Sequence, residues 1–305
     1  MAEGGAELGL RPQGCFIKLY CDDQEEPYEL HSISYKLHPT GVAVCTFNTP
    51  KNMNCLTNNQ QWETFALLEH MARDDDVRVA VWTGAGKAFN AGADLKGDQT
   101  LMVPEHVREK MRARGMGPVP GDFVLKPQTL AFWDFPKPSV VAVNGMAIGG
   151  AANMALANFH DFVLCSTEAR FMFPFPKLGF TPELGSSFVM PYLVGMARAK
   201  ELFFLSDWLP ADRAKEMGLV NRVVAPEALM SEAMAVAEQL SSKHPAALHH
   251  AKRIVNHHLR KRLEEVLDEE LGTIRESLKA TKGPPGVAQW MKEREEVMRQ
   301  ARAKL

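Results

Sequence analysis

The chain repeats one local pattern, in which an apolar segment typical of a β-strand leads to a glycine-containing turn and then to a helix. The pattern occurs at Val77–Thr83 with the downstream turn Ala91–Asp94, and again at Ser139–Val143 with the turn Gly149–Ala152. A helix of small residues is expected after the second turn, before another short apolar strand at Asp161–Ser166. Strands that alternate with helices are typical of α/β proteins. We therefore expect an α/β fold.

The segments on either side of this core have a different character. Residues 1–27 are rich in glycine and acidic side chains, so we expect a flexible N-terminal arm. Ser32–Leu37 and Val42–Phe47 are predicted to pair as a hairpin. Thr57 and Gln60 have the spacing of a capping box, which predicts the start of a helix. After the core, three helices are expected, over Pro226–Leu240, Pro245–Leu259 and Arg262–Lys279.

Composition argues against several classes of function. The 305 residues carry a formal net charge of −2, which gives no general attraction to nucleic acids or anionic membranes. No apolar run approaches the ~20 residues of a membrane span, and residues 1–14 lack the basic and apolar regions of a secretory signal. No carboxylate stands at metal-ligand spacing beside the histidine pairs, so no metal site is predicted. The cysteines are odd in number and form no C-x-x-C pair, so we expect free thiols at Cys15, Cys21, Cys45, Cys55 and Cys165.

One carboxylate stands in an otherwise apolar segment. Glu183 lies within residues 173–187, which carry no other charge after Lys177. Apolar surroundings disfavour the ionised form, so its pKa should rise toward the range of a general base. The two glycine-containing turns could each present backbone N–H groups to an anionic oxygen, and one base with two amide donors is what proton transfer next to a carbonyl requires. From the residues alone, two other interpretations stay open: the glycines allow tight packing, and Glu183 is a solvent-exposed loop carboxylate.

Longer blocks of the sequence carry a family resemblance. Ala88–Leu95, Pro138–Gly150 and Ala211–Val224 occur in order and resemble the enoyl-CoA hydratase/isomerase (crotonase) superfamily. The resemblance implies a crotonase-like spiral of repeated ββα units over residues 28–224. It also implies a C-terminal helical region, residues 225–305, which in that family builds homotrimers or hexamers. An apolar face suits such contacts, or packing within the chain, at Leu229, Met230, Met234, Ala237 and Leu240.

The resemblance further implies a site. In the superfamily the carbonyl oxygen of an acyl-CoA thioester lies between two backbone N–H groups, which by position belong here to Ala93 and Gly150. A Cβ at residue 150 would intrude on the thioester, which gives glycine a physical reason there. Glu183 falls where the peroxisomal type of Δ3,Δ2-enoyl-CoA isomerase carries its base, in the motif Pro182–Ser187. Further substrate contacts are expected at Ala91, Gly92, Asp94, Leu95, Lys51 and Asn54. Asp94 could instead begin a helix, and Lys51 could serve only solubility.

The same resemblance argues against hydration. In the superfamily's hydratases two glutamates position the water, and those positions fall here at Asn153 and Phe175, neither of which can act as a base. Leu184 stands where glycine is usual in the isomerase motif, which would narrow the acyl pocket or shift the carboxylate. We therefore predict a Δ3,Δ2-enoyl-CoA isomerase of fatty-acid β-oxidation, without a metal or redox cofactor. The alternatives are a dienoyl-CoA isomerase or hydrolase on the same fold, and a non-catalytic acyl-CoA-binding protein.

The last three residues resemble a targeting signal. Ala303–Leu305 is similar to the Ser-Lys-Leu peroxisomal address, with another small residue in first position. This signal agrees with the resemblance to a peroxisomal isomerase. In a eukaryote we expect the protein in the peroxisome or a related organelle, with the import receptor as a partner; otherwise we expect it in the cytoplasm.

Overall fold

The computed structural model describes residues 16–21, 24–94, 102–113, 125–157 and 159–280. Three residues named in the sequence analysis cannot be placed fully. Leu95, a predicted substrate contact, and Cys15, a predicted free thiol, are not described, and of Cys21 only the backbone is described. The C-terminal tripeptide Ala303–Leu305 also lies outside the described residues.

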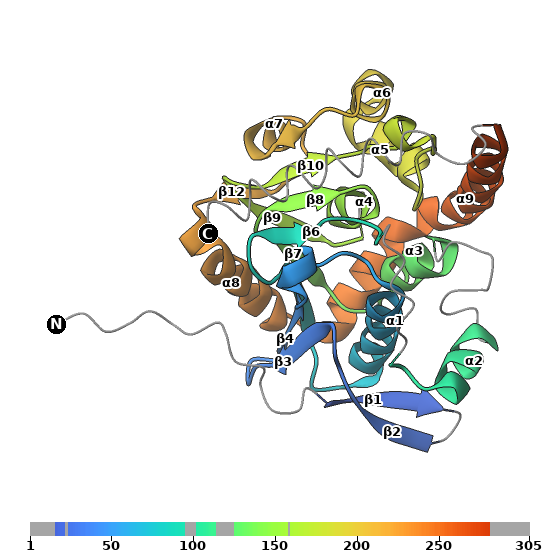
Figure 1. Cartoon of the computed structure of the whole chain (residues 1–305). Helices are drawn as coiled ribbons and strands as arrows, with labels where there is room; N and C mark the ends of the chain where they lie inside the picture. The colour runs from blue at the N-terminus through green and yellow to red at the C-terminus, as the bar shows by residue number, and fades with distance from the viewer. Residues whose placement is uncertain (1–15, 22–23, 95–101, 114–124, 158, 281–305) are drawn as a thin grey trace.

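Two sheets form the framework of the molecule (Figure 1). The central sheet has the strand order β12-β9-β7-β5-β4-β3, and its strands are parallel except for β3, which pairs antiparallel with β4. Its strands are β3 (Ile33–Leu37), β4 (Val42–Phe47), β5 (Val79–Gly84), β7 (Ser139–Val143), β9 (Phe162–Ser166) and β12 (Arg222–Val224). The smaller sheet has the order β11-β10-β8-β6, with β6 (Ala88–Asn90), β8 (Met146–Ile148), β10 (Arg170–Met172) and β11 (Leu209–Pro210).

Consecutive strands alternate between the two sheets. The pairs β5–β6, β7–β8 and β9–β10 each give their first strand to the central sheet and their second to the smaller one. After each pair the chain returns through helical segments, so it winds as a spiral of ββα units, and the predicted α/β fold is confirmed. The helices are α1 (Asn58–Arg73), α2 (Glu105–Ala113), α3 (Leu125–Trp133), α4 (Gly150–Leu156), α5 (Ser186–Val194), α6 (Met196–Leu205), α7 (Ala211–Glu216), α8 (Leu229–Ser241) and α9 (Pro245–Ala280). Short 3-10 turns lie at Pro50–Asn52, Pro176–Leu178 and Pro226–Ala228.

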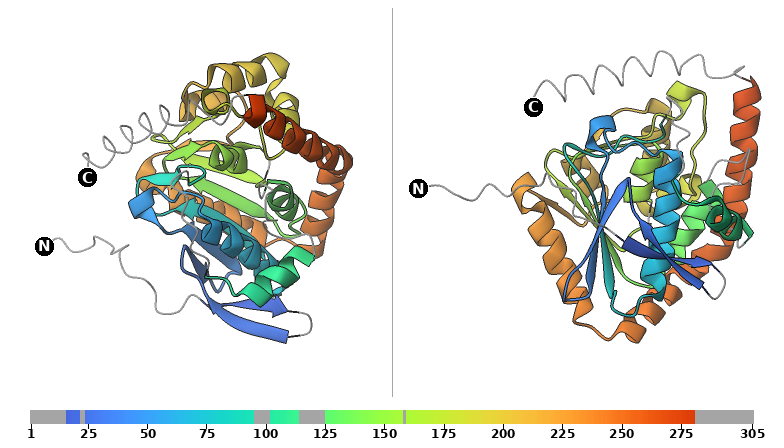
Figure 2. Two further views of the ribbon diagram at one scale, coloured as in Figure 1. Left: turned by 45° about the vertical axis from the view of Figure 1, so that its right-hand side comes forward. Right: turned by 60° about the horizontal axis from the view of Figure 1, so that its bottom comes forward.

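Helices cover both faces of the central sheet. In Figure 2 the sheet is seen nearly edge-on in the right-hand view, with α8 on one side and α1 on the other. Leu229 and Ala237 of α8 pack in one apolar cluster with valines of the sheet such as Val79 and Val140. The apolar face that suggested subunit contacts is therefore used within the chain. Across the described residues, no helix combines the length and the apolar character that a membrane crossing needs.

The expectation of a flexible arm over residues 1–27 is wrong for its second half. Strand β1 (Phe16–Cys21) pairs antiparallel with β2 (Gln24–Glu29), and the hairpin packs against α1. Ile17 and Leu19 alternate inward and are buried, so the hairpin contributes to the main core. Residues 1–15 lie outside the described part of the chain.

Two helix predictions also need correction. The break expected between Leu259 and Arg262 does not occur, and α9 runs unbroken through both predicted helices. At that point Arg260 donates its guanidinium Nε to Asp134, the residue after α3. The capping box is half formed: Thr57 Oγ1 accepts from the backbone N–H of Gln60, 3.2 Å away. The side chain of Gln60 instead accepts from Asn90 (Nδ2 to Oε1, 3.2 Å).

Candidate active site

Three segments that carry predicted site residues leave the smaller sheet at the same edge. Strands β6, β8 and β10 are parallel neighbours, so their carboxyl ends lie side by side. The turn Ala91–Asp94 follows β6, the turn at Gly149 follows β8, and the segment that leads to Glu183 follows β10. The carboxyl edge of a parallel sheet is where open α/β folds place their ligands. Predicted residues far apart in the sequence are thus collected at one place.

Close backbone packing brings the two glycine-containing turns together. Gly92 has a φ of +81°, and a Cβ on it would lie 2.5 Å from the carbonyl oxygen of Ile148, the last residue of β8. Hydrogen bonds from Asn90 and Leu56 fix the turn. Asn90 Oδ1 accepts from the N–H of Gly92 (2.9 Å). The N–H of Leu56 donates to Gly92 O (2.9 Å), and Leu56 O accepts from the N–H of Asp94 (3.1 Å). Ala93, the predicted oxyanion residue of this turn, is exposed.

Gly150 is the first residue of α4, the position that the oxyanion role predicts. Gly149 precedes it with a φ of +58° and donates its N–H to Met172 O (2.9 Å), which ties the turn to β10. The N–H groups of a first helical turn have no carbonyl partner within the helix, and they lie at the positive end of its dipole. An anionic oxygen at this point would meet both.

The carboxylate of Glu183 lies directly against Gly150. A Cβ on Gly150 would be 3.2 Å from Oε1 of Glu183 and 3.4 Å from Cδ1 of Leu184. A Cβ at residue 150 would therefore crowd the carboxylate of Glu183, the candidate base. The sequence predicted glycine here for the close approach of a thioester, which stays a prediction. Leu56 completes this wall, with its Cδ1 at 3.7 Å from the same point. Leu56 was not among the predicted site residues.

The environment of Glu183 raises the pKa of its carboxyl group. Its side chain is half-buried, and burial, with the charge of Glu270 as a further cause, raises its pKa to about 8. Burial disfavours the charged form of a carboxyl group, and a second nearby carboxylate acts in the same direction. The prediction that desolvation dominates agrees with these causes. The alternative of a freely solvated loop carboxylate does not.

The backbone of Glu183 is fixed by its neighbours. Its carbonyl oxygen accepts from Asn153 Nδ2 (2.9 Å), from Ser186 Oγ (2.7 Å) and from the N–H of Ser186 (3.1 Å). Asn153 lies on α4, one turn after Gly150, and is completely buried. The residue that stands at a hydratase glutamate position therefore holds the candidate base from the helix that carries the candidate oxyanion residue. Sequence reasoning recognised that Asn153 is not a base but missed this role.

Phe175, at the second position where hydratases carry a glutamate, has apolar surroundings. Phe175 is buried, and its ring packs against those of Phe173 and Phe203. Among the described residues, no carboxylate takes the place of either hydratase glutamate, because Asn153 and Phe175 occupy both positions. Nor do His, Cys, Asp and Glu gather in threes anywhere in the described ranges in a way that could hold a metal ion.

Asn54 and Lys51, both predicted to bind substrate, differ in their surroundings. Asn54 is fully buried with a φ of +57°, and its side chain bonds to the protein backbone. Its Nδ2 donates to Ala85 O and Ala88 O (both 2.9 Å), and its Oδ1 accepts from the N–H of Thr49 (2.9 Å). Asparagine tolerates the left-handed region better than most residues, so Asn54 builds the loop. Lys51 is exposed on the adjoining 3-10 turn, and Cys55 is buried with its thiol donating to Asn52 O.

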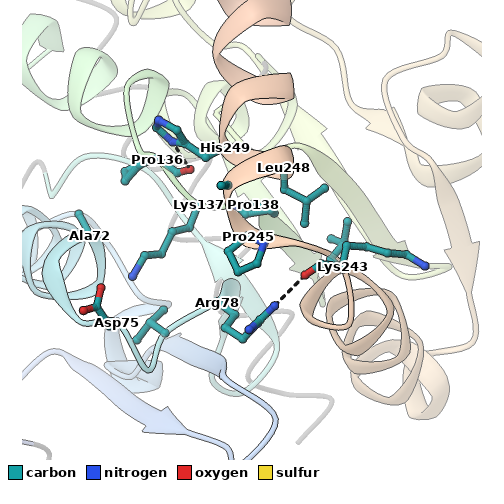
Figure 3. A pocket seen from close by; sticks show the side chains of 13 residues that line it. Ala72, Asp75, Arg78, Pro136, Lys137, Pro138, Lys243, Pro245, Leu248 and His249 are labelled. Carbon is teal, nitrogen blue, oxygen red and sulfur yellow. Dashed lines mark hydrogen bonds between the residues drawn. The ribbon is translucent and has the colours of Figure 1, made fainter.

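A cavity elsewhere in the molecule does not belong to this site. It has a volume of about 260 Å³ and lies at the amino ends of β5 and β7, near the start of α9, as Figure 3 shows. Two of the cations that line it bind backbone carbonyls: Lys137 Nζ donates to Met71 O (2.6 Å) and Asp74 O (2.5 Å), and Arg78 donates to Lys243 O (2.7 Å). These contacts join α1 and α8 to the sheet, which is a structural role.

Glu270 is a further residue of the site that sequence reasoning missed. It lies on α9, is buried, and accepts hydrogen bonds from the residues that follow Glu183. A signal was available, because Glu270 falls on the buried stripe of α9 formed by Leu263, Leu267 and Ile274. An acidic residue in an apolar stripe of a helix indicates a specific partner.

Known proteins share this architecture. A model of the enoyl-CoA hydratase/isomerase family matches residues 38–300. The chain is 35% identical over 216 residues to a short-chain-enoyl-CoA hydratase of Clostridium acetobutylicum, covering 70% of this chain and 77% of the relative. It is 31% identical to the 1,2-epoxyphenylacetyl-CoA isomerase of Escherichia coli, over 75% of this chain and 84% of the relative. It is 30% identical to enoyl-CoA delta isomerase 2 of Rattus norvegicus, over 77% of this chain and 57% of the relative.

Solved structures agree with the sequence relatives. An enoyl-CoA hydratase/isomerase from Pseudoalteromonas atlantica superposes with a TM-score of 0.74 at 28% identity, covering 86% of this chain and 98% of that chain. Another, from Xanthobacter autotrophicus, gives a TM-score of 0.71 at 30% identity, covering 90% and 96%. With the family model spanning most of its length, the chain belongs to the enoyl-CoA hydratase/isomerase family, within the crotonase superfamily.

Proposed function

We propose that the protein is a Δ3,Δ2-enoyl-CoA isomerase in which Glu183 is the acid and base. The observation that carries this proposal is the single carboxylate of Glu183 against Gly150, in a site whose two hydratase positions hold Asn153 and Phe175. Relatives of the chain include proteins named as hydratases and as isomerases, so family membership alone does not select between the reactions. The residue types at the site support isomerisation.

The proposed reaction uses one carboxylate twice. Ionised Glu183 takes a proton from C2 of a 3-enoyl-CoA thioester, and the electron pair shifts onto the carbonyl oxygen to form a dienolate. The backbone N–H groups of Ala93 and Gly150 stabilise this oxyanion. Protonated Glu183 then delivers the proton to C4, and the double bond comes to lie between C2 and C3. The reaction moves one proton from C2 to C4 without net electron transfer, so it needs no redox cofactor.

The raised pKa suits this task. A base is most effective when its pKa lies near the working pH, because it is then strong and still partly ionised. A carboxyl group with a pKa of about 8 is a stronger base toward carbon than an ordinary glutamate. Hydration would need a second group to orient and activate water. Asn153 donates its amide to the backbone of Glu183, and Phe175 offers no polar atom.

The deciding experiment compares two substrates and two variants. With 3-hexenoyl-CoA we expect formation of trans-2-hexenoyl-CoA, followed by ultraviolet absorbance, and with crotonyl-CoA we expect negligible addition of water. Glu183→Gln should lower kcat by at least ~10²-fold, because it keeps the shape of the side chain and removes the base. Asp94→Asn, a change of the other carboxylate near the turn, should cost less than ten-fold. A hydration rate equal to the isomerase rate, or a Glu183→Gln variant with more than a tenth of wild-type kcat, would refute the assignment.

We further propose that Ala303–Leu305 directs the protein to the peroxisome of a eukaryotic cell. The support is the similarity of this tripeptide to the Ser-Lys-Leu address together with the isomerase motif. A fusion with a fluorescent protein at its N-terminus should co-localise with a peroxisomal marker, and removal of the three residues should leave it in the cytosol. Import that continues after the truncation would show that the tripeptide is incidental.

A further inference from the structure

The backbone just after Glu183 has an unusual conformation. Leu184 and Gly185 both lie in the left-handed region, with φ of +60° and +74°. For a residue with a Cβ this region is disfavoured, and leucine has no side-chain hydrogen bond that could compensate. The direction in which Glu183 points depends on this pair of residues. Contacts from elsewhere in the molecule must therefore hold the segment in place.

Helix α9 supplies those contacts through one carboxylate. Glu270 Oε2 accepts from the N–H of Gly185 (2.8 Å), and its Oε1 accepts from the N–H (3.0 Å) and from Oγ (2.5 Å) of Ser187. Glu270 is buried, at 6% exposure, although it comes from a helix whose other acidic residues face solvent. Leu263 adds an apolar contact, since a Cβ on Gly185 would lie 2.3 Å from its Cδ1.

The charge of Glu270 matches the position it occupies. Ser186 and Ser187 begin α5, and a carboxylate is favourable beside the N–H groups of a first helical turn. The two serines of the motif thus have different hydrogen-bond partners. Ser186 donates to the carbonyl of Glu183, while Ser187 donates to Glu270.

Glu183 is consequently held from two helices. Asn153 on α4 fixes its carbonyl group, and Glu270 on α9 fixes the residues that follow it. Among the described residues, Glu270 is the charged group that acts on Glu183, and Glu269 is the one that acts on Glu270. The negative charge of Glu270 is also a cause of the raised pKa of Glu183.

We propose that Glu270 is a positioning residue for the reaction: from α9 it locks Leu184–Ser187 in the conformation that aims the Glu183 carboxylate at Gly150. The inference rests on the proposed function of Glu183 as the base. It makes the C-terminal helix part of the active site, and it gives Ser187 a role through Glu270.

The test compares Glu270→Gln with the matched variant Glu269→Gln. The two changes are chemically identical and adjacent, but the Glu269 side chain is 62% exposed and pairs with Arg262 on the surface. With 3-hexenoyl-CoA, Glu270→Gln should lower kcat at least ten-fold with KM within three-fold of wild type. The acidic limb of its pH profile for kcat/KM should move to lower pH, because the like charge beside Glu183 is gone. Glu269→Gln should match the wild type in kcat and in its profile.

A milder variant keeps the test decisive if Glu270→Gln fails to fold. Ser187→Ala removes one of the three hydrogen bonds and should lower kcat about three-fold, with an unchanged melting temperature within two degrees as the check on folding. The inference is overturned if Glu270→Gln keeps kcat within two-fold of wild type while Glu183→Gln is inactive. If Glu270→Gln does not fold, the same result for Ser187→Ala overturns it. It is equally overturned if folded Glu270→Gln loses activity with an unmoved pH profile. An active Glu183→Gln would instead refute the proposed function, and this inference with it.

Discussion

The carboxyl group of Glu183 has an ordinary pKa of 4.5, and in the folded protein burial and the charge of Glu270 raise its pKa to about 8. Between those pH values the folded protein holds a proton that the unfolded chain releases. The stability contributed by this group is therefore fully present below pH 4.5 and is lost as the pH rises through about 8. The raised pKa that suits Glu183 to the proposed role of base thus lowers the stability of the protein at the pH where the carboxyl group is ionised.

We expect Glu183→Gln to reveal this cost. At pH 5 the wild-type side chain is protonated and resembles glutamine, so the two proteins should melt at similar temperatures. At pH 9 the wild type has a half-buried charge that the variant lacks, so the variant should melt at the higher temperature. Thermal unfolding at pH 5, 7 and 9 measures the difference. A difference that does not grow with pH would contradict the raised pKa.

How far these residues could be predicted depends on whether their partners are local. The segment around Glu183 carries no nearby charge, so the direction of its pKa follows from the sequence. The contribution of Glu270 does not, because the apolar stripe around it indicates a buried partner without showing that the partner is the distant segment after Glu183. The hydrogen bonds of Asn54 could not be predicted for a related reason. Its partners are backbone carbonyls of a distant turn, which no pattern of side chains reveals.

Among the elements, the N-terminal hairpin departs most from prediction. Acidic residues near its turn give residues 1–27 the composition of a disordered arm and obscure the alternation of Ile17 and Leu19. The hairpin and the chain that follows it are anchored to α1 by the buried carboxylate of Glu63. That group accepts from Tyr28 Oη (3.0 Å) and from the N–H groups of His31 (2.7 Å) and Ser32 (2.8 Å). These hydrogen bonds join residues far apart in the sequence, so the sequence alone does not predict them.

Glu63→Gln should therefore destabilise the protein by about 2–3 kcal/mol, because donors buried against the carboxylate lose an acceptor. Urea unfolding gives the change in free energy, and hydrogen exchange should show the backbone amides of β1 and β2 losing protection first. Glu216→Gln serves as a control, since that side chain is 65% exposed in a surface pair with Arg213 and should change stability by less than about 0.5 kcal/mol. Equal effects of the two variants would show that Glu63 is not an anchor.

For the whole molecule, the order of the ββα units could be predicted because the family blocks occur in sequence. Which apolar surfaces stay exposed could not be predicted. The apolar face of α8 was a candidate for subunit contacts, and it packs on the central sheet instead. A pattern of apolar residues shows that a helix face will be covered, without showing what covers it. A different surface has the properties of an interface. Large apolar side chains remain exposed on α5 and α6, at Tyr192, Leu193, Met196, Phe204 and Leu205.

We expect this α5–α6 surface to join copies of the chain. Five large apolar side chains, 39% to 68% exposed on two consecutive helices, are more than scattered surface positions usually supply. A closed ring of three chains would give the trimer expected from the family resemblance, and two stacked rings would give the hexamer. Sedimentation velocity should then show three or six times the mass of one chain, and Phe204→Glu should lower that mass, because it would bury an unpaired charge. Ile254→Glu tests the alternative face on α9, where Ile254 and Val255 are also exposed, and should leave the mass unchanged. A monomeric wild type, or dissociation by Ile254→Glu alone, would show that the α5–α6 surface has another purpose.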